Sequence, residues 1–450
     1  MPDNPLLDYF RCPDSLVQVE LRGDLSSENG YFVFRDAVCY GRLAGRRPSV
    51  HPEDNLADAF EGVEIDNGRV RLPFELSEVV TNIRREQYRQ NGFRFLDRVT
   101  SGPAAQRAYY FVRPMLRVGV RKHLQKIRLS GWERIVFPRW PVDVSVDALL
   151  RHVLGLCMCQ LDVDRIPFIW FWPDGAECAV MMTHDVESSV GRAFCETVMD
   201  VDDSFGVKSA FQLVPEGQER EWLALAERLR RRGFEVNLHD LNHDGLLFYD
   251  RSEFLVRAAK INQYARQFKC DGFRSGAMYR QQQWYDAFEF SYDMSVPNVA
   301  SLEPQRGGCC TVMPYFIGEI LELPLTTVQD YSLFHILNDY SISLWTQQIE
   351  AIREQNGLIT LLAHPDYLAG RGALPVYKAL LAYLQGLRAQ SKIWTALPSE
   401  VNRWWRSRRQ MSLVPDRKSW RIEGPDADRA RLAYATWDGG TVRYVLADAV

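Results

Sequence analysis

The sequence lacks three features that would place it in a common class of protein. It has no excess of basic residues, since 58 Asp and Glu outnumber 54 Lys and Arg and give a net charge of -4. A general nucleic-acid binder normally carries a strongly basic domain, so no nucleic-acid partner is expected. The nine cysteines include no C-x-x-C pair, which argues against a disulfide framework and a zinc ribbon. No apolar run is long enough to span a membrane, so no transmembrane segment is expected.

The amino-terminal segment also lacks the pattern of a secretory signal. It reads MPDNPLLDYFRCPDS, with acids where a signal peptide carries basic residues and without the apolar stretch that follows them. We therefore expect a cytoplasmic protein, in a compartment that suits free thiols. Hydrophobic residues make up 46% of the chain and charged residues 25%, which is the ordinary balance of a folded protein.

The 450 residues divide by pattern into three parts. Residues 1–160 are polar and rich in turns to about residue 72 and then carry an amphipathic helix from residue 74, which predicts an N-terminal α+β accessory region. Residues 161–410 alternate short β-rich runs with helical stretches, which predicts a mainly parallel sheet wrapped by helices. Residues 411–450 place alternating runs around the turn signals GPDAD and WDGG, which predicts a small C-terminal antiparallel β appendage.

The central part supplies enough elements for a (β/α) barrel, complete or distorted. Its expected strands are short apolar runs, at 179–183, 209–214, 234–238, 270–275, 319–325 and 358–363. Its expected helices show apolar residues at a spacing of about 3.6, at 218–232, 251–268, 281–289, 343–355 and 376–389. In the C-terminal appendage we expect three strands, at 419–423, 430–436 and 441–446. The fold class is therefore α/β.

Three basic segments stand out. Residues 105–128 read as a helix that mixes aromatic residues with Arg and Lys and is interrupted by Pro114. A packed surface helix is the interpretation we favour, although the pattern also allows a peripheral contact with an anionic membrane. The runs RLRRRG (228–233) and RWWRSRR (403–409) are typical of solvated helix faces, and we assign them no function.

The stretch CAVMMTHDVESS (178–189) turns from apolar to ionisable at the end of a predicted strand. In a parallel sheet or barrel, functional groups collect at the carboxyl ends of the strands. Asp185 and Glu187 are two residues apart, so both carboxylates point the same way if the extended conformation persists. Two carboxylates on one face repel each other unless a cation lies between them. A metal ion is the simplest such cation.

Two histidines follow another predicted strand, in FEVNLHDLNHDG (234–245). His239 and His243 are four residues apart, a spacing that puts both imidazoles on one face of a helix. One carboxylate and two histidines leave a coordination position open for water and substrate, as in catalytic metal sites. This reasoning leaves open whether Asp185 or Glu187 is the ligand.

Two further strands end in groups that suit such a site. Arg274, in CDGFRSG, could hold a neighbouring carboxylate ionised and oriented. His364, in LITLLAHPDY, could act as a general acid. Four of the eight histidines lie at predicted strand ends, at 184, 239, 243 and 364. The other four, at 51, 123, 152 and 335, show no such placement.

Each of these groups also has a simpler interpretation. Asp185 and Glu187 could cap the helix that follows them. The two histidines after 238 could begin a solvated helix, and Arg274 could pair with a surface acid. His184 faces the opposite side of its strand by alternation, so we interpret it as a structural, hydrogen-bonded histidine.

The motifs THDVE, HDLNH, GFRSG and LLAH, in this order, resemble those of polysaccharide deacetylases, the NodB-homology group of carbohydrate esterases. The resemblance covers about residues 165–400. It implies a distorted (β/α) barrel of the NodB-homology type and one divalent metal ion, with zinc favoured and cobalt or nickel also suitable. It also implies the removal of N-acetyl, sometimes O-acetyl, groups from sugars.

The resemblance assigns metal ligands. His239 and His243 match the two metal histidines of the family, and Glu187 matches the acidic ligand of members that write the motif as acid-x-acid. The commoner motif has adjacent aspartates, and Val186 occupies the position of the usual ligand here. An exchange of roles between Asp185 and Glu187 therefore stays open.

The resemblance also assigns catalytic residues. Asp185 matches the base that takes a proton from the attacking water, and Arg274 matches the arginine that positions this base. His364 matches the general acid that protonates the departing amine. The acid that tunes this histidine is not obvious from the sequence, and Asp330 and Asp366 are candidates for it.

These observations together lead us to expect a metal-dependent deacetylase that acts on an acetylated sugar or glycan. Two alternatives remain. The first is a barrel amidohydrolase that cleaves a non-sugar C–N bond, and the second is a non-catalytic glycan-binding or assembly protein.

Overall fold

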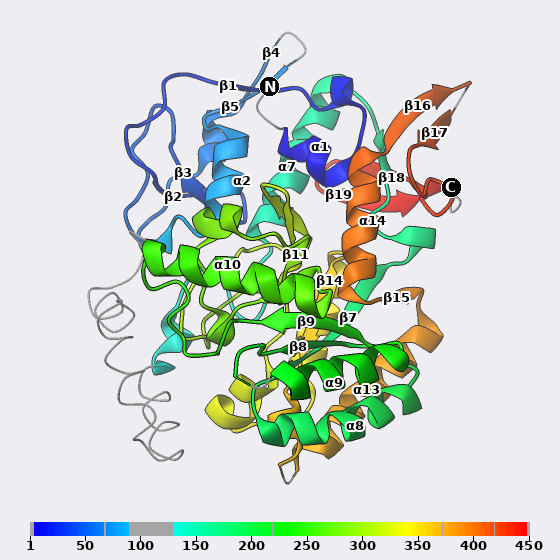
Figure 1. The fold of residues 1–450 in the computed structure, drawn as a ribbon. Helices are drawn as coiled ribbons and strands as arrows, with labels where there is room; N and C mark the ends of the chain where they lie inside the picture. Colours follow the sequence, from blue (N-terminus) through cyan, green and yellow to red (C-terminus); the bar gives the residue numbers. More distant parts are fainter. Residues whose placement is uncertain are drawn as a thin grey trace.

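A curled, mostly parallel sheet forms the centre of the protein (Figure 1). The computed structural model describes residues 4–66, 69–89, 129–217, 219–370, 372–417 and 419–447. In these ranges the sheet runs in the spatial order β12 (Tyr315–Ile317), β13 (Ile320–Glu322), β11 (Tyr292–Asp293), β10 (Gly272–Arg274), β9 (Glu235–His239), β8 (Ala210–Leu213), β7 (Cys178–Val186) and β14 (Leu358–Leu362). A further strand, β15 (Ile393–Thr395), also pairs with β7. All pairs are parallel except β12 with β13, so the predicted distorted barrel is confirmed.

Helices alternate with these strands, as predicted. They are α8 (Ser189–Ser204), α9 (Glu219–Arg231), α10 (Arg251–Phe268), α11 (Ser343–Glu354), α12 (Pro365–Leu368), α13 (Ala373–Gln390) and α14 (Pro398–Gln410). In Figure 1, α8, α9 and α13 gather at the bottom of the molecule and α10 crosses in front of the sheet. Among the described residues, no helix is both long and apolar enough to cross a membrane.

One predicted α-helix, at 281–289, is a short 3₁₀ helix, η7 (Gln282–Ala287). Its backbone bonds join residues three apart, from Trp284 N to Gln281 O at 2.9 Å and from Phe288 N to Tyr285 O at 3.0 Å. Other 3₁₀ helices of the described chain are shorter still, namely η1 (Asp14–Leu16), η2 (Ala59–Gly62), η4 (Trp132–Arg134), η5 (Pro173–Gly175) and η6 (Gly276–Met278).

Two threonine side chains help to close the barrel between β13 and β14. Thr326 and Thr327 each donate a hydrogen bond of 2.8 Å to a carbonyl of β14, at Leu358 and Thr360. Thr360 N in turn donates to the Thr326 hydroxyl at 2.8 Å. Hydrogen bonds from threonine side chains therefore replace the backbone hydrogen bonds that a regular barrel would have here. The chain leads directly from Thr327 to Asp330, which lies beside the end of β14.

The N-terminal region contains both helices and strands, as predicted. Its elements are α1 (Pro5–Phe10), β1 (Val19–Leu21), β2 (Gly30–Phe34), β3 (Ala37–Gly41), β4 (Glu64–Asp66), β5 (Arg69–Leu72), α2 (Leu76–Arg84) and α7 (Ser145–Leu161). The helix predicted from residue 74 corresponds to α2. The basic helix predicted at 105–128 lies outside the described residues.

The C-terminal strands are β16 (Ser412–Asp416), β17 (Ser419–Glu423), β18 (Leu432–Trp437) and β19 (Val442–Leu446). The last three match the strands predicted at 419–423, 430–436 and 441–446. On its other edge, β18 pairs antiparallel with β6 (Arg165–Ile169). The C-terminal sheet is therefore completed by β6, a strand from the start of the range 161–410 that was expected to form the barrel.

A buried ion pair joins the N-terminal region to the barrel. Arg280 Nε donates to Glu86 Oε2 at 2.6 Å, and both side chains are almost fully buried. Gly308 N also donates to Glu86 Oε1 at 2.6 Å. Breaking such a pair leaves an uncompensated buried charge, so this contact strongly couples the two parts.

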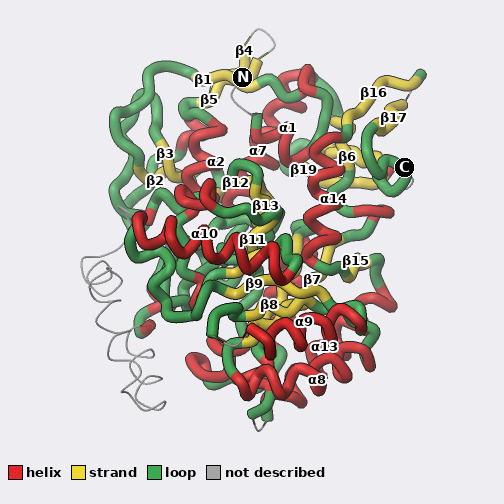
Figure 2. Tube along the Cα trace, in the orientation of Figure 1, coloured by secondary structure: helices red, strands yellow, loops and turns green. Residues whose placement is uncertain are grey.

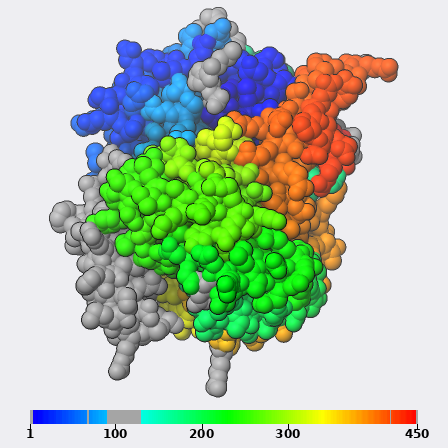
Figure 3. Space-filling model, in the orientation of Figure 1, coloured from blue at the N-terminus to red at the C-terminus, as the bar shows by residue number. Residues whose placement is uncertain are grey.

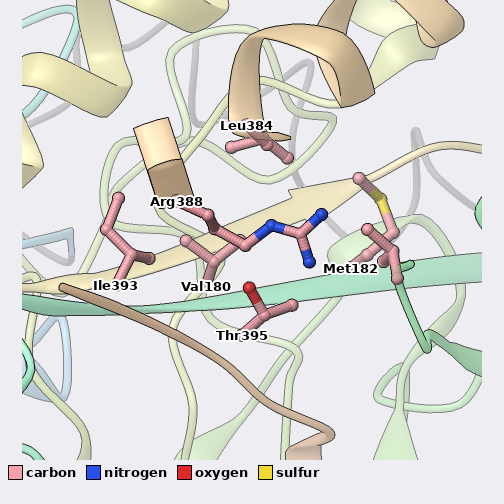
Figure 4. A pocket seen from close by; sticks show the side chains of 7 residues that line it. Val180, Met182, Leu384, Arg388, Ile393 and Thr395 are labelled. Carbon is pink, nitrogen blue, oxygen red and sulfur yellow. The ribbon is translucent and has the colours of Figure 1, made fainter. Parts of the chain in front are cut away.

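A cavity of about 10 Å³ lies between β7, β15 and α13 (Figure 4). Val180, Met182, Leu384 and Ile393 give it a mainly apolar lining. This volume is enough for about one water molecule. The space is a packing defect of the core and shares no residue with the strand ends described next.

Candidate metal centre

The six predicted site residues lie together at the carboxyl ends of β7, β9, β10 and β14. They are Asp185, Glu187, His239, His243, Arg274 and His364. Their strands are neighbours or next neighbours in the sheet, so a curled parallel sheet brings them to one point from positions far apart in the sequence.

Glu187, His239 and His243 form a cradle for a cation. Each offers one ligand atom, and these atoms lie within 4.8 Å of one another. Glu187 Oε1 is 3.0 Å from His243 Nε2 and 3.8 Å from His239 Nε2. Among the described residues, the buried His239 Nε2 has no hydrogen-bond partner. Nitrogen and oxygen ligands bind zinc at about 2 Å, so small side-chain movements would let all three atoms share one ion.

The two histidines do not lie on a helix, which corrects the geometry expected from their spacing. His239 is the last residue of β9, and His243 lies in the loop that follows. Asp240 and His243 both adopt left-handed conformations, with φ of 57° at each. These turns fold the loop back, so the two rings are 4.9 Å apart.

A backbone hydrogen bond orients the first histidine. His239 Nδ1 is 3.1 Å from the carbonyl oxygen of Arg274. A carbonyl can only accept, so Nδ1 carries the proton and the lone pair of Nε2 faces the cradle. A metal ligand held in this way keeps its tautomer and its ring orientation.

Arg274 holds Asp185 beside the cradle. Arg274 Nη1 donates to Asp185 Oδ1 at 2.9 Å and to the Thr183 hydroxyl at 2.9 Å, and its Nε donates to Met294 O at 3.0 Å. Burial raises the pKa of Asp185, but the charge of Arg274 outweighs it and holds the pKa below its usual value. Asp185 therefore stays a carboxylate, with Oδ2 3.7 Å from His239 Nε2.

Glu187 is also held in its charged form. Burial opposes the charge, but His243 and His239 beside the carboxylate keep its pKa well below the usual range. Asp366 accepts a hydrogen bond from the backbone N of Glu187 at 3.2 Å and another from the Ser188 hydroxyl. These contacts fix the chain where it leaves β7.

His364 completes the cluster opposite the histidine pair. Its Nε2 is 3.7 Å from Glu187 Oε1, and its Nδ1 is 2.6 Å from Asp330 Oδ1. Burial lowers the pKa of His364, but Asp330, Glu187 and Asp185 outweigh it and raise the pKa to about 10. Of the two acids considered from the sequence, Asp330 contacts this histidine, and Asp366 contacts the start of α8 instead.

His184 faces away from the cluster, as predicted from strand alternation. It is fully buried, with Nδ1 2.8 Å from Ala363 O and Nε2 3.2 Å from Asp202 Oδ2. The Tyr377 hydroxyl is 3.3 Å from the same Nε2. The structural interpretation of His184 is confirmed.

Aromatic side chains beside His364 were missed in the sequence. The Tyr367 ring is 4.9 Å from the His364 ring, and Tyr331 and His335 lie 5.3 and 5.2 Å from Tyr367. Tyr331 precedes the π-helix η8 (Ser332–Leu337), and π-helices are frequent at functional sites. His335 carried no strand-end signal, because it lies within this π-helix and not at the end of a strand.

Comparison with known proteins found similarity among solved structures. No protein-family model and no curated protein matches the sequence. Over about half its length, however, the chain is similar to polysaccharide deacetylases and to an allantoinase. A structure assigned as a polysaccharide deacetylase, from Mycobacterium smegmatis, matches with 19% identity over 56% of this chain and 98% of its own, at a TM-score of 0.45.

Two other solved structures show the range of the similarity. Puue allantoinase matches with 10% identity over 52% of this chain and 92% of its own, at a TM-score of 0.42. A CE4 family pseudoenzyme from Bacillus anthracis matches with 14% identity over 51% of this chain and 66% of its own, at a TM-score of 0.34. At such identities the likeness concerns the fold alone, and the chemistry has to be argued from the residues.

Proposed function

We propose that the protein is a metal-dependent hydrolase that removes N-acetyl groups from a sugar or polysaccharide precursor. The observation that carries this proposal is the convergence of two histidines and one carboxylate, flanked by Asp185 and His364. Three protein ligands with further coordination positions open are typical of catalytic sites.

Glu187, His239 and His243 would hold the ion. Two imidazole nitrogens and one carboxylate oxygen suit zinc, and cobalt or nickel also accept this set. A divalent ion held there would polarise the acetyl carbonyl and lower the pKa of the attacking water. Glu187 lies 3.0 Å from His243 and 3.8 Å from His239, and its ligand atom groups with those of both histidines. Asp185 lies 3.7 Å from His239 and is held by Arg274, so we assign Glu187 as the ligand and Asp185 as the base.

Asp185 takes the proton from the attacking water. Arg274 occupies one carboxylate oxygen, so only Oδ2 faces the cradle. The fixed guanidinium keeps this base ionised and limits its rotation. A positioned base of this kind contributes about 10²- to 10⁴-fold to the rate.

His364 donates the proton that the departing amine needs. Asp330 holds Nδ1, so the proton on Nε2 is directed towards the cradle. The raised pKa keeps the imidazolium protonated at neutral pH. The ring of Tyr367 beside it offers an aromatic face, which suits the apolar face of a sugar.

The direct test measures acetate released from a panel of N-acetylhexosamine glycans by the metal-loaded wild type and by Asp185→Asn. We expect the variant to lose about 10²- to 10⁴-fold in kcat while it keeps its metal, because the base is lost and the ligands stay. Asp271→Asn changes an exposed aspartate directly before β10 and should leave the rate unchanged.

Other outcomes of this assay favour other functions. Release of ammonia from small amides, without acetate from any sugar, would favour an amidohydrolase. A wild type that binds one metal ion but turns over nothing in the panel would favour a non-catalytic glycan-binding protein. Equal rates for wild type and Asp185→Asn would contradict the assignment of the base.

A further inference from the structure

A second cluster of charged side chains surrounds a cavity of about 20 Å³ that shares no residue with the metal centre. The cavity lies among α1, α2, β12 and α14, which meet at the upper part of the molecule in Figures 1 and 2. The residues of its lining that matter here are Asp8, Arg84, Tyr315, Trp405, Arg408 and Arg409. Figure 3 shows the blue, yellow and orange segments meeting on this face.

Arg408 is buried at this place, which corrects the expectation that the run 403–409 is a solvated helix face. Its side chain is 1% exposed. Its Nε donates to Trp170 O at 3.1 Å, and its Nη2 donates to Tyr9 O at 2.9 Å and to Ile169 O at 2.7 Å. These carbonyl groups accept hydrogen bonds from the Arg408 guanidinium but carry no net charge that would balance its positive charge. Burial, with the nearby charge of Arg11, lowers the pKa of Arg408.

The other guanidinium groups also lack acidic partners. Among the described residues, no carboxylate lies within ion-pair distance of Arg84, Arg408 or Arg409. The Nε atoms of Arg84 and Arg11 are buried without a hydrogen-bond partner in the described chain. Arg84 lies over the Tyr315 ring at 5.3 Å and Arg409 over Phe316 at 4.3 Å, which fixes the two side chains without neutralising them.

A concentration of like charges is unfavourable in the free protein, most of all where one of them is buried. Asp8 supplies the one carboxylate of the lining and is exposed. Arginine is the residue that recognises phosphate best, because its planar fork matches the oxygens and stays charged. We propose that Arg84, Arg408 and Arg409, here called the arginine pocket, bind a phosphate group.

The size of the cavity limits how the ligand enters. Its volume of about 20 Å³ corresponds to one or two water molecules. One phosphate group can replace this water if the rest of the ligand stays outside. Inorganic phosphate and the terminal phosphate monoester of a larger molecule both fit this description, and the experiment below separates them.

The test is calorimetric titration of the full chain with inorganic phosphate and, in parallel, with glucose 1-phosphate, at constant ionic strength in chloride. The double variant Arg84→Gln/Arg409→Gln removes two charges of the pocket and leaves the buried Arg408 in place. Arg403→Gln removes an exposed charge from the same helix, outside the lining, and is the matched control. His239→Ala shows whether phosphate binds at the metal centre instead.

We expect the wild type, Arg403→Gln and His239→Ala to bind one phosphate with similar affinity, and the double variant to bind at least about tenfold more weakly, since charged hydrogen bonds are lost. Equal affinity for both probes would indicate the free ion, and tighter binding of glucose 1-phosphate would indicate a monoester. In phosphate-free buffer the double variant should melt at a temperature no lower than that of the wild type, because the substitutions relieve the repulsion between the arginine side chains. No saturable binding to the wild type, or binding lost only in His239→Ala, would overturn the proposal.

Discussion

His364 and Asp330 show how one carboxylate sets the chemistry of a neighbouring side chain. Asp330 accepts from both the backbone N of His364, at 2.8 Å, and its Nδ1, at 2.6 Å. Burial would favour the neutral imidazole, but the carboxylates around it raise the pKa of His364 to about 10. The histidine is therefore the group that carries the transferable proton over the neutral range.

Asp330→Asn should shift the alkaline limb of the pH–rate profile to lower pH. The substitution removes the negative charge that opposes the burial of the imidazolium, so the pKa of His364 falls and its protonated form is lost at lower pH. The measurement is kcat/KM for acetate release between about pH 6 and 10, a range that spans the usual and raised pKa of histidine.

Asp366→Asn is the control for this profile. Asp366 contacts Ser188 and the backbone of Glu187, so its loss can reduce the rate but should leave the alkaline limb in place. An unchanged alkaline limb in Asp330→Asn would contradict the role given to His364.

The proximity of the six predicted site residues could be predicted from the sequence, because each lies at or shortly after the end of a predicted strand. The partner of His364 could not, since Asp330 and Asp366 are both close to a strand end and only the path of the chain after β13 decides between them. The burial of Arg408 could not be predicted either. A basic run on a helix predicts a solvent-exposed face, and the sequence gives no sign of the segments that cover Arg408.

At the scale of elements, the loop after β9 determines where the second metal histidine lies. Its left-handed residues bring His243 back towards His239, and Gly276 at the start of η6 packs directly against it. A Cβ at Gly276 would lie 2.4 Å from Asp240 Oδ2 and 3.0 Å from His243 Cδ2. The loop after β9 therefore leaves no space for a side chain at position 276.

Gly276→Ala should weaken metal binding although it changes no ligand. The added methyl group displaces the His243 ring, and disturbance of the groups around a metal ligand typically costs about 10- to 100-fold in affinity. The measurement is competition of the apo protein with a zinc chelator of known affinity.

Gly386→Ala is the matched control for this change. Gly386 lies within α13, and a Cβ there has no neighbour within 4 Å, so metal affinity should not change. Equal affinity of Gly276→Ala and the wild type would contradict the proposed packing of the loop.

The longer elements of the barrel were predictable because their apolar runs or helical periods extend over several residues. The strands β11, β12 and β15, of two or three residues each, were not. Segments this short show no alternation, and they become strands only because neighbouring strands are already in place. The 3₁₀ helix η7 was mistaken for an α-helix for the same reason, since six residues cannot distinguish the two periods.

At the scale of the whole molecule, buried charge makes folding depend on pH. Glu303 is 4% exposed and accepts a hydrogen bond from Gln329 at 2.6 Å. Burial raises its pKa from 4.5 to about 7. Between these two values the folded chain holds a proton that the unfolded chain has released, so stability falls as the pH rises through this window.

Glu303→Gln should remove this loss. The free energy of unfolding of the variant should exceed that of the wild type by a larger amount at pH 8 than at pH 5. The two amounts should differ by roughly 2–3 kcal/mol, as the change in pKa requires. Urea unfolding of both proteins at the two pH values measures it. Glu227→Gln, at an exposed position on α9, should show no such difference, and a Glu303→Gln gain that is the same at both pH values would refute the assignment.

The metal stoichiometry of purified variants tests the central claim most directly. After dialysis against zinc and then metal-free buffer, elemental analysis should find about one equivalent in the wild type, in Asp185→Asn and in the exposed control His51→Ala, as expected for three intact ligands. His239→Ala, His243→Ala and Glu187→Gln should each retain far less. Full retention of zinc by these three variants, with correct folding, would contradict the account.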